Sequence, residues 1–156
     1  MQVVRFQCAQ DVCAIPVLAV KEFCRPLAVT RVPLADPRII GIANIRGKCA
    51  TVLDLRSCFA KPVGEAIAHP RMVLLETNDN LTSEAIKLGI KAPDEPVVLL
   101  VDRIIDIITV STDAIQPRPA NISKRFVAGI FRIGTEYIAL LDMASLIDQI
   151  MQSQEL

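Results

Sequence analysis

The sequence predicts a mainly β protein built from two similar small β units. Short runs rich in β-branched residues recur along the chain, ten prolines interrupt it, and long helical stripes are scarce. In addition, the spacing of apolar and acidic residues in the first half recurs in the second half, which indicates an internal repeat.

Candidate strands follow one another along the whole chain. The ranges with strand-like composition are 3–8, 12–18, 48–53, 72–76, 97–101, 103–108 and 137–141. Between 86 and 91, apolar and other residues alternate with the period of a half-buried strand, so this range is predicted to be a strand as well. Asp36 followed by Pro37 predicts one helical turn. Apolar spacing typical of a helix begins at Leu55 and again at Met143.

The repeat has two parts with slightly different offsets. Val20 corresponds to Ile104 at an offset of 84 residues, and Gly41 corresponds to Gly129 at an offset of 88 residues. We interpret this as two similar β units joined near residues 60–70. Units of this size are too small to be stable alone, so they should bury apolar surface against each other. Closure into small barrels would remove their sheet edges.

The composition excludes several classes of function. Of 156 residues, 52% are apolar and 22% are charged, which supports a packed core. The 17 basic and 17 acidic residues balance, so no nucleic-acid partner is expected. Apolar runs are too short for a membrane span and the start of the chain does not resemble a signal peptide, so we expect a cytoplasmic protein without direct membrane insertion.

Cysteines are expected to be reduced and mostly buried. The chain contains five, an odd number, and none forms the C-x-x-C spacing typical of zinc or redox sites; they are Cys8, Cys13, Cys24, Cys49 and Cys58. We therefore expect small buried hydrophobic side chains rather than disulfides or metal ligands.

The sequence does not favour an enzyme. Asp54, Asp102 and Asp142 each follow an apolar strand, a place where α/β enzymes carry active-site carboxylates. Asp54 and Asp142 also stand directly before helical patterns, and we favour helix N-caps for both. The single histidine, His69, is more typical of a linker than of a catalytic base. Common hydrolase, metalloprotease and phosphate-binding motifs are missing, so no cofactor or metal is expected.

Arg46 stands in a largely apolar, strand-like segment beside Gly47. An arginine there could cover apolar neighbours, pair with a carboxylate such as Glu22, or contact a partner protein. The equivalent position in the second unit, at an offset of 88, is Gly134. A requirement of the fold should apply to both copies, so this difference weakens a purely structural role, but the residues alone leave both roles open.

Four blocks of sequence resemble the CheW family. The segment GIANIRGKCATVLDLR at 41–56 resembles the family's most characteristic motif, with its N-x-R-G core and a strand ending in D-L-R. The segments AIPVLAVKEFCRPLAVTRVP at 14–33, VVLLVDRIIDIITVSTDAIQP at 97–117 and FVAGIFRIGTEYIALLDMASLI at 126–147 resemble the other family blocks, in the family order.

This resemblance implies a fold. CheW-like proteins consist of two five-stranded barrels of the Src-homology-3 (SH3) type, packed together, with short helices. The resemblance implies one CheW-like domain over 1–156. Its first subdomain would span about 13–65, its second about 66–142 together with the N-terminal strand, and a C-terminal helix about 143–152.

The resemblance also implies a function. The family consists of non-enzymatic adaptors that couple the cytoplasmic tips of methyl-accepting chemoreceptors to the regulatory domain of a CheA-type histidine kinase in bacterial chemosensory arrays. The receptor is expected to bind in a groove between the barrels, at positions that map onto Val20, Glu22, Gly41, Arg46, Val98, Ile104 and Ile107. The kinase surface cannot be assigned to residues.

Two features depart from the family. Val98 replaces a glycine that many members carry, and a larger side chain there is expected to reshape the receptor groove. The segment from 77 to 96 has an unusual composition for the family's variable hairpin. These features leave a specialised adaptor in polar localisation or twitching motility as an alternative. A second alternative is a kinase regulatory domain, which shares the fold; this chain has no ATP-binding or phosphoacceptor segment, so it would be a fragment of such a kinase.

Overall fold

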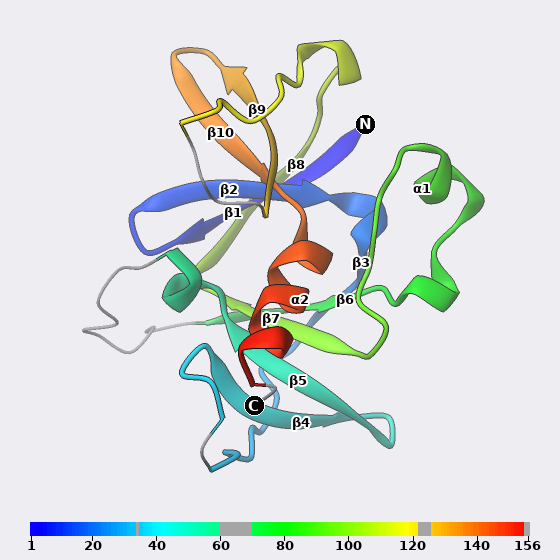
Figure 1. Cartoon of the computed structure of the whole chain (residues 1–156), viewed down its shortest axis with the longest axis vertical. Coiled ribbons are helices and arrows are strands. Elements are labelled where there is room, and N and C mark those ends of the chain that lie inside the picture. The colour runs from blue at the N-terminus through cyan, green and yellow to red at the C-terminus, as the bar shows by residue number, and fades with distance from the viewer. Residues whose placement is uncertain (34, 60–69, 122–125, 155–156) are drawn as a thin grey trace.

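The described part of the chain forms two five-stranded sheets (Figure 1). The computed structural model describes all residues except 34, 60–69, 122–125 and 155–156. The terminal sheet consists of β1 (Gln2–Cys8), β2 (Asp11–Pro16), β8 (Arg103–Thr109), β9 (Val127–Ile133) and β10 (Glu136–Leu141). The middle sheet consists of β3 (Val20–Cys24), β4 (Ile39–Ile45), β5 (Lys48–Asp54), β6 (Arg71–Leu75) and β7 (Val97–Val101). Two α-helices, α1 (Ser83–Lys87) and α2 (Met143–Gln154), and four short 3-10 helices, Val17–Ala19, Leu55–Phe59, Asn78–Asn80 and Thr112–Ala114, complete the described structure.

The two sheets are copies of one arrangement, which confirms the predicted pair of similar units. Their strand orders, β3-β6-β7-β5-β4 and β8-β1-β2-β10-β9, correspond position by position. In both, one parallel pair, β5 with β7 and β10 with β2, joins otherwise antiparallel strands. The pairs β4/β9 and β5/β10 keep the offset of 88 residues read from the sequence.

The sheets divide the chain differently from the expected boundary near residues 65 and 66. β6 and β7, expected in the second unit, pair within the middle sheet, while β2 and the strands after β7 belong to the terminal sheet. The reason is the parallel pairing of β7 with β5, which draws the strands after residue 70 back onto the first unit. The sheets are also open, because β3 and β4 form the two ends of one sheet and β8 and β9 the two ends of the other.

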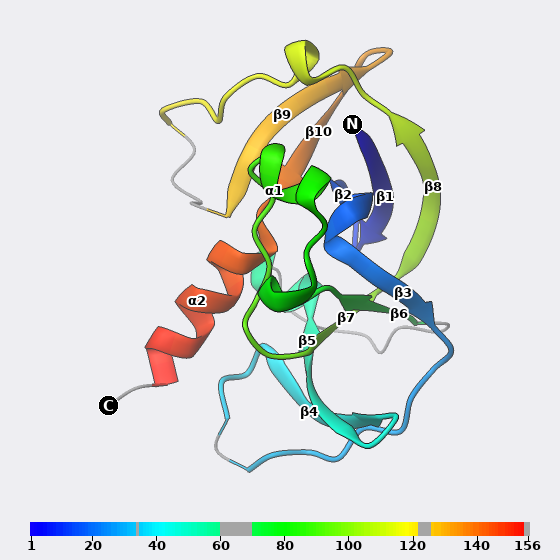
Figure 2. The same cartoon turned by 90° about the vertical axis from the view of Figure 1, so that its right-hand side faces the viewer.

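An apolar layer joins the two sheets. Its fully buried members include Phe6 and Ile15 from the terminal sheet and Leu53 and Leu99 from the middle sheet, and α2 adds Leu146, Ile147 and Ile150. Two smaller clusters fill the opposite face of each sheet. Figure 2 shows the sheets one above the other with α2 along one side. The amphipathic face of α2 confirms the helix predicted from the spacing after Met143.

One local prediction was wrong and another was met. Residues 86–91 do not form a strand: Thr82 Oγ1 accepts the Ala85 N–H at 3.1 Å and begins α1, and Gly89, with φ of 75°, follows the end of that helix. Ile86 is 63% exposed, so the alternating pattern there did not mark a buried face. The single turn predicted at Asp36 is observed: its side chain accepts the Arg38 N–H at 2.9 Å, its carbonyl accepts the Ile39 N–H at 2.8 Å, and β4 begins at Ile39.

Candidate protein-interaction site

Arg46 occupies a two-residue turn between β4 and β5. Its φ is +50° and that of Gly47 is +84°, between the paired residues Ile45 and Lys48. Two positive φ values in a two-residue hairpin are typical of a type I′ turn. Gly47 meets this requirement freely, whereas an arginine in the left-handed region is uncommon and strained.

The second unit has the same requirement and meets it with glycine. Gly134, in the turn between β9 and β10, has φ of +59°. The shared backbone geometry therefore explains why position 134 is glycine. It does not explain why position 46 carries an arginine. An observed backbone outlier of this kind supports a functional hypothesis for the side chain.

The side chain of Arg46 pairs with Glu22. Arg46 Nη2 donates to Glu22 Oε2 at 2.7 Å, and the side chains are 68% and 33% exposed. The hydrogen bond from Arg46 lowers the pKa of the Glu22 carboxyl and raises that of the guanidinium. Because Glu22 lies on the edge strand β3 and Arg46 follows the other edge strand β4, the pair spans the open side of the middle sheet.

The terminal sheet uses the equivalent carboxylate differently. Asp106, which lies 84 residues after Glu22, accepts two hydrogen bonds from Arg5 on the adjacent strand β1, at 2.7 Å and 2.6 Å. This bidentate pair stays within one sheet and does not reach the β9–β10 turn. An ion pair that connects the β-hairpin turn to the opposite edge strand is therefore a feature of the middle unit.

Val20, Ile104 and Ile107 lie along the edge of the apolar layer between the sheets. Directly paired residues share a face of a sheet. Ile107 pairs with Val4, and Val20 pairs with Leu75. Val4 and Leu75 are buried members of the layer between the sheets. Val20 and Ile104 pack partly against this layer, whereas Ile107 is 48% exposed.

We call Val20, Ile104 and Ile107 the seam surface. All three are on β3 and β8, one edge strand of the middle sheet and one edge strand of the terminal sheet. Figure 2 shows both strands on the side of the molecule opposite α2. The apolar layer is covered by α2 on one side and partly exposed along these edge strands on the other.

Gly41 and Val98 do not contribute side-chain surface to this region. Val98 is fully buried inside the middle unit, so the expectation that it lines a surface groove is not met. A Cβ built on Gly41 would lie 2.1 Å from the carbonyl oxygen of Thr30, so close backbone approach requires glycine there. Gly129, its counterpart, is similarly crowded by Ile115 and Gln116.

The aspartates act as structural groups. Asp142 accepts the Ser145 N–H at 3.2 Å and the Ser145 hydroxyl at 2.7 Å, which confirms the predicted N-cap of α2. Asp54 accepts the Arg56 N–H at 3.0 Å at the start of a 3-10 helix, so its capping role is also observed.

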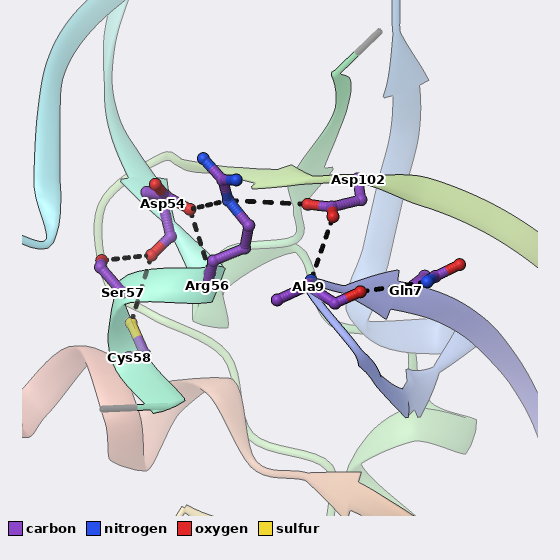
Figure 3. A network of polar contacts seen from close by, with 7 residues as sticks. All are labelled: Gln7, Ala9, Asp54, Arg56, Ser57, Cys58 and Asp102. Atoms are coloured by element: carbon purple, nitrogen blue, oxygen red, sulfur yellow. Dashed lines mark hydrogen bonds and ion pairs between the residues drawn. The ribbon is translucent and has the colours of Figure 1, made fainter. Parts of the chain in front are cut away.

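Arg56 forms a polar bridge that sequence reasoning missed. Its Nε lies 3.5 Å from Asp54 Oδ1 and 3.6 Å from Asp102 Oδ1, and its side chain is 14% exposed (Figure 3). Asp102 also accepts the N–H of Ala9, which has φ of +57° in the β1–β2 turn. Asp54 ends β5 of the middle sheet, and Ala9 lies in the turn between β1 and β2 of the terminal sheet, so the bridge links the two units. The D-L-R motif and the aspartate after β7 were its sequence signal.

The remaining candidates add little to the site. His69 lies outside the described residues. Within the described part of the chain, all five cysteines are free thiols, with Cys8, Cys13 and Cys58 buried. No described cluster of three His, Cys, Asp or Glu side chains is arranged to hold a metal ion. None of the helices among the described residues is both long and apolar enough to cross a bilayer.

Comparison with known proteins identifies the family. A family model described as "CheW-like domain" matches residues 2–151. The chemotaxis protein CheW of Treponema pallidum (strain Nichols) is 28% identical over 148 residues, which cover 93% of this chain and 81% of that protein. The chemotaxis protein CheW of Bacillus subtilis (strain 168) is 29% identical over 130 residues, which cover 83% of this chain and 74% of that protein.

A solved structure supports the fold independently. The crystal structure of the scaffolding protein TtCheW from Thermoanaerobacter tengcongensis matches with a TM-score of 0.74 at 22% identity, over 90% of this chain and 87% of that one. The family model covers nearly the whole chain, and this solved scaffolding protein shares the fold of the chain. The protein therefore belongs to the CheW-like domain family.

Proposed function

We propose that the protein is a non-enzymatic cytoplasmic adaptor that couples chemoreceptor tips to the regulatory domain of a CheA-type histidine kinase. The seam surface is the observation that carries this proposal. It leaves apolar side chains of two edge strands partly exposed beside a shared core, and the receptor tip, by resemblance a helical hairpin, offers an apolar helix face to cover them. Family membership supports the adaptor role.

The contribution of each part follows from its exposure. Ile107 is 48% exposed, and full burial of an isoleucine contributes about 2 kcal/mol, so covering the rest of this side chain would contribute about 1 kcal/mol. Arg46 donates to Glu22 through one Nη2 N–H, and a guanidinium carries five N–H donors, so the side chain can also bind a carboxylate or carbonyl of the partner. In this arrangement Glu22 holds the arginine in place.

The experiment compares Ile107→Asp with Ile86→Asp. Both isoleucines are exposed, but Ile86 is on α1 and does not belong to the seam surface. Isothermal titration with the soluble receptor fragment of the same bacterium should give at least about fivefold weaker binding for Ile107→Asp and wild-type binding for Ile86→Asp. Thermal unfolding and kinase-domain binding serve as controls. Equal receptor affinity of the two variants would contradict the proposed use of the seam surface.

Arg46→Gly tests the arginine separately. Glycine suits the left-handed backbone at this position, as it does at Gly134, so the variant should fold at least as stably as the wild type. Receptor binding should nevertheless weaken, because the variant loses the guanidinium. A variant that binds the receptor normally would assign Arg46 to the fold alone.

A further inference from the structure

A pocket opens beside the Arg46–Glu22 pair, at the mouth of the middle unit. It has a volume of about 200 Å³. We call it the mouth pocket; its lining residues are Lys21, Ile45, Arg46, Lys48, Leu74, Leu75, Thr77, Asn80 and Pro96. Its floor includes leucines of β6, and its rim comes from β3, the β4–β5 turn and the segment after β6.

The rim carries positive charge. Lys21, Arg46 and Lys48 line the pocket and are exposed, and no aspartate or glutamate is among the described residues that line it. Arg46 is already paired with Glu22, but no ion pair involves Lys21 or Lys48 among the described residues. Several cations around a pocket with an apolar floor attract an anionic group that is attached to an apolar or helical carrier.

The pocket adjoins the seam surface through a single strand. Val20, Lys21 and Glu22 are consecutive on β3. The pairing with β6 shifts between Val20 and Glu22, so Lys21 is an unpaired residue in a β-bulge. Bulges redirect side chains at sheet edges and are frequent beside functional sites. Here the bulge places the apolar seam on one face of β3 and Glu22 on the other, with Lys21 between them.

We infer that the mouth pocket receives an acidic side chain from the partner helix that covers the seam surface. This inference rests on the proposed function and specifies the chemistry of its partner. The helix lays its apolar face along the edge strands and presents a glutamate or aspartate to Lys21, Arg46 and Lys48. A short carboxylate fits a pocket of this size, and the apolar floor accommodates its methylene groups.

The charge pattern predicts how binding depends on salt. The cations are exposed, so each contributes little alone and their attraction is screened by salt. Together they should accelerate association and select an acidic partner rather than dominate affinity. Reversing two of them should weaken binding about five- to tenfold at low salt, and the difference should shrink at high salt.

The first test uses the receptor fragment and a matched pair of double variants. Lys21→Glu/Lys48→Glu reverses the charge of two of the three rim cations, whereas Lys87→Glu/Arg132→Glu makes the same change of charge at exposed residues that do not line the pocket. Titrations at about 50 mM and about 300 mM salt should show weaker, less salt-dependent binding for the first variant alone. Equal weakening by both variants, or none by the first, overturns the inference while leaving receptor coupling intact.

The second test does not depend on receptor binding. A synthetic helical peptide with glutamates along one face is titrated into the labelled protein, and a peptide with glutamines at the same positions serves as the control. Backbone amide NMR signals of Lys21, Lys48, Thr77 and Asn80 should shift with the glutamate peptide alone. Equal shifts with both peptides, or no shifts at millimolar peptide, overturn the inference. Failure of the receptor fragment to bind the wild type would overturn the proposed function instead, and the peptide result would still decide the chemistry of the pocket.

Discussion

Replacing Gly41 with alanine should destabilise the protein more than the same replacement at Gly129 or Gly47. A Cβ at position 41 would lie 2.1 Å from the Thr30 carbonyl oxygen and 2.9 Å from a methyl group of Val29. The Thr30 carbonyl is held by the Ile42 N–H at 2.8 Å, and the Thr30 N–H donates back to Ile42 at 2.8 Å. Relieving the overlap requires a backbone shift of about 1 Å, which breaks both bonds.

The magnitude follows from these contacts. Two backbone hydrogen bonds contribute about 1 kcal/mol each, and overpacking typically adds about 1–3 kcal/mol. We therefore expect Gly41→Ala to lower the free energy of unfolding by about 3–5 kcal/mol, a large part of the roughly 5–15 kcal/mol typical of a domain. Gly41 does not have a positive φ, so this loss arises from the steric overlap and not from backbone conformation.

The other two glycines provide graded controls for urea unfolding. A Cβ on Gly129 would lie 2.7 Å from the Ile115 side chain and 2.9 Å from the Gln116 carbonyl oxygen, so Gly129→Ala should cost about 2 kcal/mol. A Cβ on Gly47 would meet no described atom within 4 Å, and its φ of +84° should make Gly47→Ala cost only about 1 kcal/mol. If Gly41→Ala proves no more destabilising than Gly47→Ala, close backbone approach is not the reason for glycine at position 41.

Three further predictions concern groups outside the seam surface. Asp102→Asn should lower the free energy of unfolding by about 1–3 kcal/mol, because it weakens the polar bridge between the units; an unchanged urea midpoint would contradict this role. Arg5 holds the pKa of Asp106 below its ordinary value of 3.8, so the stabilisation by this pair is present above that value and is lost as pH falls through the lower folded pKa. The stability difference between wild type and Asp106→Asn should thus shrink from pH 7 to strongly acidic pH, and a constant difference would contradict the pairing. Exposed Cys49 should react with a thiol reagent at pH 8 well before Cys58, whose pKa burial raises to about 11; equal rates by peptide mapping would contradict this burial.

Local patterns in the sequence predicted much of the fold. Gly41 and Gly129, 88 residues apart, occupy equivalent places in the two sheets. At both positions a crossing backbone segment approaches closely, so there is no room for a side chain. The aspartates at the ends of β5 and β10 cap the helical segments after these strands, because a carboxylate there satisfies free backbone N–H groups. The repeated glycines and the capping aspartates depend on residues close together in the chain, so both could be recognised from the sequence alone.

Non-local pairing could not be predicted in the same way. The parallel alignment of β7 with β5 depends on contacts between residues far apart in the chain, and it decides which unit β6 and β7 join. The sequence also did not show on which face of the sheet each side chain lies, because a one-residue shift in pairing moves every side chain to the opposite face. The bulge at Lys21 produces this shift on β3, and it separates Val20 from Glu22, which were expected in one groove.

Comparison of the two units gives a general way to separate fold from function in this protein. Equivalent positions that share a backbone requirement but differ in side chain are candidates for specific roles. Position 46 and position 134 share a left-handed backbone, yet only the middle unit places an arginine there. Its carboxylate partner Glu22 has a counterpart in Asp106, which binds within its own sheet. The fold thus accepts glycine or arginine at this turn position, and the strained arginine at position 46 is a candidate for the partner contact that we propose beside the seam surface.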